Sequence, residues 1–103
     1  MLKSMHGGNI AIVGAAETDQ IGVLPNTSVY ELHANSAVRA LADAGLTVAD
    51  VDGFATTMPN ALEVADYIGI RPTWLDGTMV GGCSYMLPVR HAAAAIAGGA
   101  AHV

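Results

Sequence analysis

The sequence is poor in cysteine and in charged residues. Its one cysteine, Cys83, excludes an internal disulfide framework and fits a reducing compartment. Charged residues make up 13% of the 103 residues and hydrophobic residues 52%, whereas roughly a quarter of the residues of a soluble protein are normally charged. A domain of this size has a large surface for its volume. We therefore expect that the chain oligomerises or forms part of a larger domain, so that much of its apolar surface is covered.

Basic residues and long apolar runs are also scarce. Four Lys and Arg residues stand against nine Asp and Glu, giving a net charge of −5 without a basic cluster, which argues against nucleic-acid binding. No apolar run approaches the ~20 residues that span a bilayer. Residues 1–8 are too short and polar for a signal peptide and are expected to form a flexible leader. We expect a cytoplasmic protein with no membrane partner. Its four histidines and one cysteine show no ligand spacing, so no metal site is expected.

Apolar runs alternate with segments of helical periodicity along the rest of the chain. Strands are predicted at 9–15, 51–57, 73–80 and from 100 onward, and helices at 28–44, 61–68 and from 83 or 84 to 97, with a single turn at 47–50. Ser28 and Asn60 have side chains that cap helix starts. Gly45 and Gly69 are typical left-handed helix stops.

The alternation of strands and helices predicts an α/β layered domain over residues 9–103 with a mostly parallel sheet. The last helix carries four consecutive alanines and has Arg90 as its only permanent charge, so we expect it to be buried. Pro88 is tolerated only in a first helical turn, which places the start of this helix near Leu87. Asp76, in the third predicted strand, could cap a turn, but we expect it to be solvated or to pair across a subunit boundary.

Cys83 stands between two glycines and the last predicted helix. A helix N-terminus carries partial positive charge, which stabilises a thiolate, so Cys83 is a candidate nucleophile; the alternative is a small buried hydrophobic residue. His91 lies about 12 Å further along the helix axis at about 1.5 Å per residue, beyond hydrogen-bond reach, and is expected to be packed or solvent-facing. His33 is expected to be packed and hydrogen-bonded. The sequence therefore offers no complete catalytic set around Cys83.

Four features in order carry a resemblance to a known family. They are the opening Ile-Ala-Ile-Val-Gly strand with its Glu-Thr-Asp turn, the helix 28–45, the Leu-Thr-Val-Ala-Asp-Val-Asp-Gly turn at 46–53, and Gly-Gly-Cys-Ser at 81–84 before a helix that ends in Ala-Gly-Gly-Ala. From Asn9 to Val103 the sequence resembles the N-terminal part of a thiolase-superfamily protein. The type it resembles is the sterol-carrier-protein-like thiolases, often labelled acetyl-CoA acetyltransferases or lipid-transfer proteins.

The resemblance implies acyl transfer through Cys83. In that family the cysteine at this position attacks an acyl-CoA to form an acyl-thioester, and a second substrate or CoA takes the acyl group, as in thiolysis or condensation of 3-oxoacyl-CoA. It also implies coenzyme A thioesters as substrates with no tightly bound cofactor, pocket roles for Gly82, Ser84 and Tyr85, and a homodimer or a dimer of dimers. The family's catalytic histidines and second cysteine lie downstream. The chain is therefore expected to be an N-terminal fragment that is inactive alone.

Two residues after the cysteine depart from the family pattern. Classical thiolases carry small residues here, whereas this chain has Tyr85 and Pro88; Tyr85 would narrow the acyl pocket or donate its hydroxyl there. Some thiolase-like relatives act as aldolases or as acyl-CoA-binding subunits. The alternative function is therefore a non-catalytic or aldolase-type acyl-CoA-binding or assembly subunit, with a small zinc-ribbon/OB-fold protein as a candidate partner. A third interpretation is an unrelated flavodoxin-like ligand-binding domain.

Overall fold

The computed structural model describes residues 9–58 and 60–103 as an α/β fold. Its elements are α1 (Val29–Ala44), the 3-10 turn η1 (Val48–Asp50), β1 (Gly53–Thr56), α2 (Ala61–Ile68), β2 (Trp74–Gly77), the 3-10 turn η2 (Gly82–Tyr85) and α3 (Leu87–Ala97). The two strands pair in parallel, with Gly53 opposite Trp74 and Thr56 opposite Gly77. The predicted fold class and parallel pairing are thus confirmed. The leader expected at residues 1–8 lies outside the described residues.

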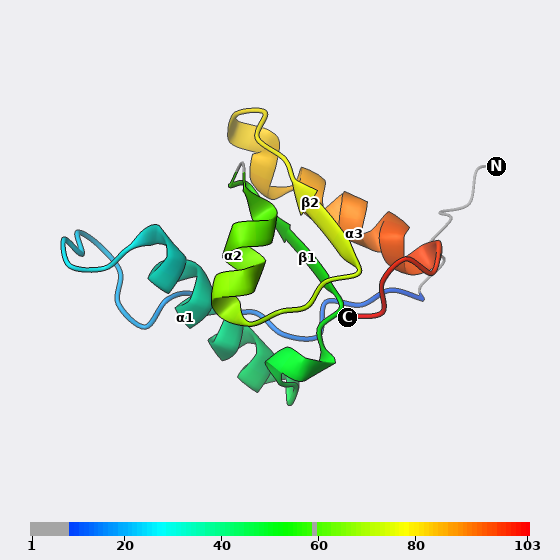
Figure 1. Ribbon diagram of the computed structural model, residues 1–103, viewed down its shortest axis with the longest axis horizontal. Helices are drawn as coiled ribbons and strands as arrows, with labels where there is room; N and C mark the ends of the chain where they lie inside the picture. The colour runs from blue at the N-terminus through cyan, green and yellow to red at the C-terminus, as the bar shows by residue number, and fades with distance from the viewer. Residues whose placement is uncertain (1–8, 59) are drawn as a thin grey trace.

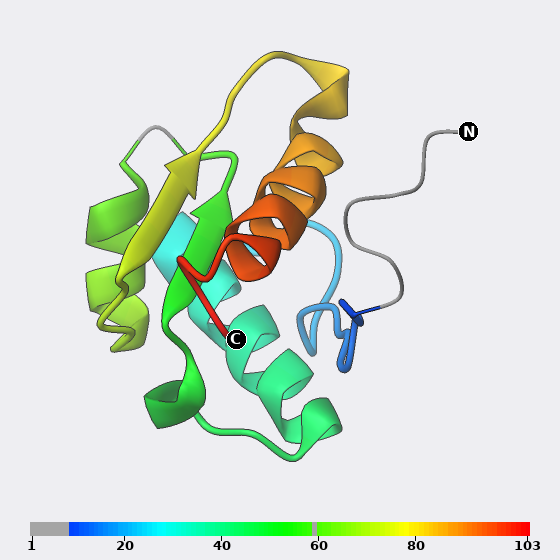
Figure 2. The ribbon, with the colours of Figure 1, turned by 90° about the vertical axis from the view of Figure 1, so that its right-hand side faces the viewer.

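The parallel sheet lies between two layers of helix. Figure 2 shows α2 on one side of the strands and α3 on the other, and α1 packs against α2 (Figure 1). Val64 and Ala65 of α2 are completely buried, and Ile70, just after this helix, is also buried. On the opposite face, Ala92 and Ile96 of α3 lie over the sheet. The small core therefore sits mainly between α2 and the strands.

The helix ends follow the predicted caps. The Ser28 side chain accepts a hydrogen bond from the Glu31 N–H at 3.1 Å, and Asn60 accepts from Glu63 N–H at 3.1 Å. Gly45 ends α1 with a φ of 73°, a conformation that side chains with a Cβ disfavour. These helix ends could be predicted because each depends on interactions between residues that are close in the sequence.

Two predicted strands are absent from the described residues. Residues 9–15 have no ladder bonding, and Ile12 and Val13 are 79% and 63% exposed. The segment from residue 100 forms backbone hydrogen bonds beside β1 only at its end, where the Val103 carbonyl accepts from the Asp52 and Gly53 N–H groups at 3.1 and 2.9 Å. An apolar run indicates a tendency to be buried, but a strand also needs a neighbour aligned along its length. These two strand predictions are therefore wrong for the chain as described.

Helix α3 starts at Leu87 with Pro88 in its first turn, as the proline predicted. The residues 82–85 before it form the separate turn η2 instead of the first turn of the helix. Pro88 and Ala95 are buried against the rest of the chain, while Val89 is 49% exposed. The predicted burial of this helix therefore holds on its sheet-facing side within this chain.

Candidate functional site

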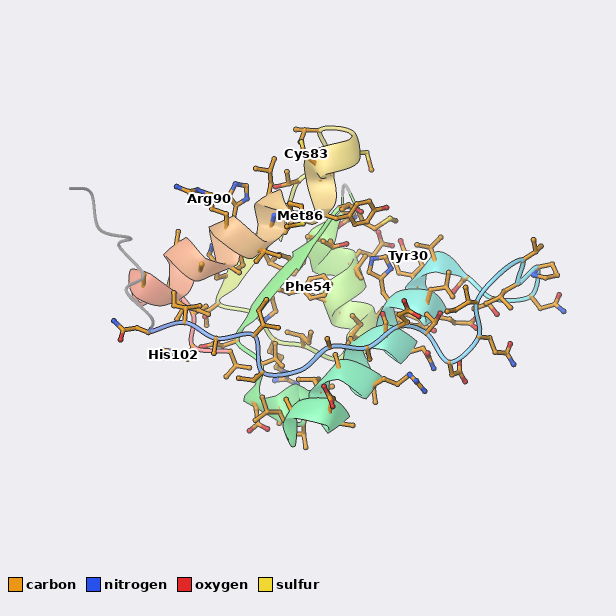
Figure 3. The ribbon with its side chains drawn as sticks, turned by 180° about the vertical axis from the view of Figure 1, so that it is seen from behind. Tyr30, Phe54, Cys83, Met86, Arg90 and His102 are labelled. Atoms are coloured by element: carbon orange, nitrogen blue, oxygen red, sulfur yellow. The ribbon has the colours of Figure 1, made fainter. Side chains whose placement is uncertain are left out.

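The candidate site lies where the two parallel strands end. Figure 2 shows both arrowheads pointing toward η2 and the start of α3, and Figure 3 shows Cys83 on η2 with Met86 just beyond it. Ligands of open α/β sheets bind outside the carboxyl ends of the strands. The predicted site residues thus belong to the edge of the sheet at which ligand binding is expected.

The turn that carries Cys83 is fixed by its own hydrogen bonds. Gly81 adopts a φ of 89°, which favours glycine, and its carbonyl accepts from the Ser84 N–H at 3.0 Å. The Ser84 hydroxyl oxygen accepts from the Val80 N–H at 2.7 Å, and Ser84 is only 3% exposed. Ser84, predicted to line the pocket, therefore holds the turn together.

Cys83 itself is exposed. It lies in η2, four positions before Leu87, the first residue of α3, so it precedes the helix N-terminus by about one turn. A Cβ added at Gly82 would meet nothing within 4 Å among the described residues, so Gly82 borders open space. The nucleophilic role of Cys83 and the pocket role of Gly82 stay predictions.

Tyr85 lies at a pocket of about 230 Å³. The lining residues come from α1, the end of β1, η2 and α3: His33, Ala55, Thr56, Thr57, Tyr85 and Pro88. Tyr85 is itself 74% exposed, so its ring stands at the rim with its hydroxyl group accessible. A pocket of this size suits one end of a ligand, since sites for whole drug-sized ligands span about 300–1,000 Å³.

His33 is packed and hydrogen-bonded at this pocket, as the sequence predicted. Its Nδ1 lies 2.9 Å from the Val29 carbonyl, and its Nε2 lies 3.0 Å from the Thr56 hydroxyl. Because a carbonyl only accepts, Nδ1 carries a proton. In the neutral ring, Nε2 therefore accepts from Thr56, whose oxygen accepts from the Met58 N–H at 3.2 Å. Both ring nitrogens of His33 are thus occupied.

A second polar cluster joins β2 to α3. His91 Nδ1 lies 2.6 Å from Asp76 Oδ2, the Thr78 hydroxyl donates to Asp76 Oδ1 at 2.7 Å, and Thr78 lies 3.4 Å from His91 Nδ1. The Asp76 side chain is 18% exposed and that of His91 42%. The expectation that Asp76 is simply solvated is therefore wrong, because its side chain is largely covered and pairs within the chain; pairing across a subunit boundary stays a prediction. Its partner was missed because residues 76 and 91 meet only when α3 packs on the sheet.

The environment keeps Asp76 ionised. Partial burial alone would raise its pKa, but the hydrogen bonds from Thr78 and His91, with the charge of the imidazole, hold the pKa below its usual range. An ionised carboxylate at Nδ1 orients the imidazole and fixes a proton on that nitrogen. In residues 9–58 and 60–103, Nε2 of His91 makes no protein hydrogen bond.

A second Asp–His pair lies at the opposite end of the sheet, near His102 in Figure 3. Asp52 Oδ1 accepts from the His102 and Val103 N–H groups at 2.8 and 3.0 Å, and Oδ2 lies 2.8 Å from His102 Nδ1. The two backbone hydrogen bonds, then the ring, lower the pKa of Asp52 to about 2. This pair joins the end of the described chain to β1.

The described residues bring no three metal-ligand side chains together. Within the same ranges, no helix is long and apolar enough to cross a membrane. The side chains near the carboxyl ends of the strands carry hydroxyl, thiol, carboxylate and imidazole groups.

Comparisons with known proteins relate the chain to a lyase and to an aldolase. No family model matches the sequence. The chain is 41% identical over 103 residues to the 17-hydroxy-3-oxo-4-pregnene-20-carboxyl-CoA lyase of Mycobacterium tuberculosis (strain ATCC 25618 / H37Rv), covering 96% of this chain and 26% of that protein. The solved Ltp2-ChsH2(DUF35) aldolase matches with a TM-score of 0.67 and 31% identity, over 85% of this chain and 23% of that one. The chain thus spans about a quarter of the length of each. Its homologues are a carboxyl-CoA lyase and an aldolase of similar fold, which favours the aldolase alternative over acyl transfer.

Proposed function

We propose that this chain is part of a lyase that cleaves a carbon–carbon bond in a hydroxyacyl-CoA thioester by retro-aldol chemistry. The observation that carries the proposal is the agreement of the two comparisons, one with a carboxyl-CoA lyase at 41% identity and one with an aldolase at a TM-score of 0.67. The pocket at the strand ends supports it, because Tyr85 and the Asp76–His91 pair belong to the same edge of the sheet.

Retro-aldol cleavage requires a hydroxyl group on the carbon β to the thioester carbonyl. Loss of the hydroxyl proton forms a ketone or aldehyde, and the electrons of the broken carbon–carbon bond pass to the thioester enolate. Protonation of the enolate carbon then gives a shortened acyl-CoA. The thioester itself accepts the electrons, so we propose that no tightly bound cofactor takes part. The reaction needs a base, a donor to the enolate oxygen and a shaped pocket; the accessible Tyr85 hydroxyl is the candidate donor.

The second candidate function is acyl transfer through Cys83. It is favoured by the exposure of the thiol on the turn that leads into α3. Such a reaction needs a thiolate and a base. In the described ranges, no hydrogen bond links Cys83 Sγ to a histidine. The aldolase proposal assigns no covalent step to Cys83.

We propose further that the lyase works in an assembly. The solved relative is named as a combination of Ltp2 and ChsH2(DUF35), so a second protein is a proposed partner of this chain alongside acyl-CoA. A homodimer and a cytoplasmic location are carried forward as proposals. The apolar side chains exposed around η2, such as Met79, Val80 and Met86, support burial of this face in an assembly.

Product analysis tests the proposal. The protein, expressed from its natural reading frame, is incubated with a 3-hydroxyacyl-CoA in the absence of free CoA, and acyl-CoA products are identified by mass spectrometry. We expect a shortened acyl-CoA and one equivalent of ketone or aldehyde. A shortened acyl-CoA formed only from a 3-oxoacyl-CoA and only with free CoA would instead establish thiolysis. The Cys83→Ala variant should then lose activity, whereas a retro-aldol enzyme should retain it.

A further inference from the structure

We propose that His91, oriented by Asp76, moves the proton during this cleavage; the inference rests on the proposed lyase function. The pair has the geometry of an oriented acid–base group. Asp76 Oδ2 and His91 Nδ1 lie 2.6 Å apart, so the Nδ1–H group donates a hydrogen bond to the carboxylate. The other nitrogen, Nε2, then has its lone pair available on a side chain that is 42% exposed.

Asp76 and His91 do not line the pocket themselves, but each is adjacent to a residue that does. Asp76 is the register partner of Ala55 on the neighbouring strand, and Ala55 lines the pocket; neighbouring parallel strands lie about 4.8 Å apart. Pro88 also lines the pocket and precedes His91 by three residues in α3, which places their Cβ atoms roughly 5–6 Å apart on one helix face. The pair is thus adjacent to the pocket lining through both β2 and α3, and a substrate that extends past Ala55 and Pro88 would reach the imidazole.

The two other histidines of the described chain do not meet the same requirements. His33 lies in the pocket but has both ring nitrogens engaged, by Val29 and Thr56. His102 resembles His91 in its carboxylate partner, but lies at the amino end of the strands with its side chain 81% exposed. Among the histidines that the structure describes, His91 alone combines an oriented ring, an available Nε2 and a place at the carboxyl ends of the strands.

Few charged or titratable groups of the described chain lie around His91, and of these only the Asp76 carboxylate is hydrogen-bonded to its ring. Asp76 faces it from β2, Arg90 precedes it on α3, and Cys83 and Tyr85 lie on η2. The strand β1 contributes no ionisable side chain.

The proton transfer balances within the substrate. Nε2 removes the proton of the β-hydroxyl group as the O–H electrons form the carbonyl and the Cα–Cβ bond breaks. The bond electrons form the thioester enolate, and the proton on Nε2 is then delivered to the enolate carbon. The net change is one proton moved from oxygen to carbon, with no oxidant or co-reactant. Asp76 stays ionised throughout and stabilises the imidazolium between the two transfers.

The variant His91→Asn separates this role from a purely structural one. Its amide N–H takes the place of the Nδ1–H, so it keeps the bond to Asp76 but lacks Nε2. We expect kcat to fall by about 100-fold or more, in the range measured for general acid–base groups, with an unchanged thermal unfolding midpoint. His102→Asn is the matched control, because it makes the same change in the Asp52 pair at the other end of the sheet; its kcat should equal that of the wild type.

A rescue experiment uses the truncated variant His91→Ala. Free imidazole should partly restore its activity, because the added imidazole can take the place of the missing ring.

Nitrogen NMR of the histidine rings gives a readout that does not depend on turnover. In its neutral form the His91 ring should show the Nδ1–H tautomer, and Asp76→Asn should shift the population toward the Nε2–H form. A wild-type Nε2–H tautomer, or a His91→Asn variant with wild-type kcat, would overturn the role of His91 while leaving the lyase function in place. Absence of cleavage by the wild-type protein would overturn the proposed function and the role of His91 together.

Discussion

The two ends of the parallel sheet carry the same pair of residue types in different surroundings. At the amino end, Asp52 receives two backbone N–H groups as well as the His102 ring. At the carboxyl end, Asp76 receives a hydroxyl from Thr78 and the His91 ring. Asp52 therefore holds the backbone of residues 102–103 in place, whereas Asp76 orients the His91 side chain.

The accessibility of the two imidazoles follows from this difference. The His102 side chain is 81% exposed, beside a carboxylate that is 28% exposed. His91 is 42% exposed, beside a carboxylate that is 18% exposed. Charge–charge and hydrogen-bond effects are stronger where water is partly excluded. The two Asp–His pairs therefore share their residue types and differ in position and surroundings, and the proposed role of His91 rests on that difference.

We expect the largest effect on kcat, and we expect it from substitution of Asp76 but not of Asp52. Asp76→Asn keeps the shape of the side chain but removes the charge, and its amide can donate to Nδ1 and thereby favour the other tautomer. We expect kcat for cleavage of a 3-hydroxyacyl-CoA to fall by roughly 100-fold or more. Asp52→Asn should leave kcat within about two-fold of the wild type, because its partner lies away from the pocket. Equal losses in the two variants would mean that both pairs act only through the fold.

The next effect concerns the turn that supports the carboxyl-end site. Gly81 has a φ of 89°, whereas Gly82 lies outside the left-handed region and a Cβ there would meet nothing within 4 Å. Gly81→Ala should therefore lower the free energy of unfolding by about 1–2 kcal/mol. Gly82→Ala should change it by less than about 0.5 kcal/mol. Chemical denaturation of the two variants measures the difference, and similar values would show that the turn relaxes in the mutants.

A smaller, local effect distinguishes the amino end. Asp52→Ala removes the acceptor of the His102 and Val103 N–H groups. We expect these two amides to exchange with deuterium at least about tenfold faster, which corresponds to the free energy of one net hydrogen bond. In Asp76→Ala their exchange should stay at the wild-type rate. Residue-resolved NMR exchange on both variants would contradict the comparison if the two protection patterns changed alike.

The local features of the fold could be predicted from the sequence, and the pairs at the sheet ends could not. Ser28, Asn60 and Pro88 mark helix starts through contacts within a few residues, and the structure follows them. Asp76 and His91 are 15 residues apart, and their meeting depends on how α3 crosses the sheet. Such a contact is set by tertiary packing, which leaves no periodicity in the sequence.

The apolar run at residues 9–15 shows the opposite error, because here the sequence predicted a strand that the structure does not form. Residues 9–15 have the composition of a strand buried on both faces, yet they form no ladder in the described chain. Composition reports the environment that a segment favours, whereas hydrogen bonding depends on an aligned neighbour. The same distinction applies to Cys83: the glycines beside it predicted a turn, and the turn is present, but the chemistry of the thiol depends on groups brought to it by packing.

The smallest effect is the acid dependence of the amino-end pair. Asp52 has a pKa of about 2 in the folded chain against an ordinary value of 3.8. Because the folded pKa is lowered, the stabilisation is fully present above about pH 4 and is lost as the pH falls through 2. Unfolding free energies measured between pH 2 and 5 should therefore decrease less steeply with acid in Asp52→Asn than in the wild type. Above pH 5 the two curves should run parallel, since the carboxylate is then ionised in both the folded and the unfolded chain. A wild-type slope that Asp52→Asn leaves unchanged would show that the backbone N–H groups do not favour the ionised carboxylate, and the amino-end pair would then lose its distinction from the pair at the carboxyl end.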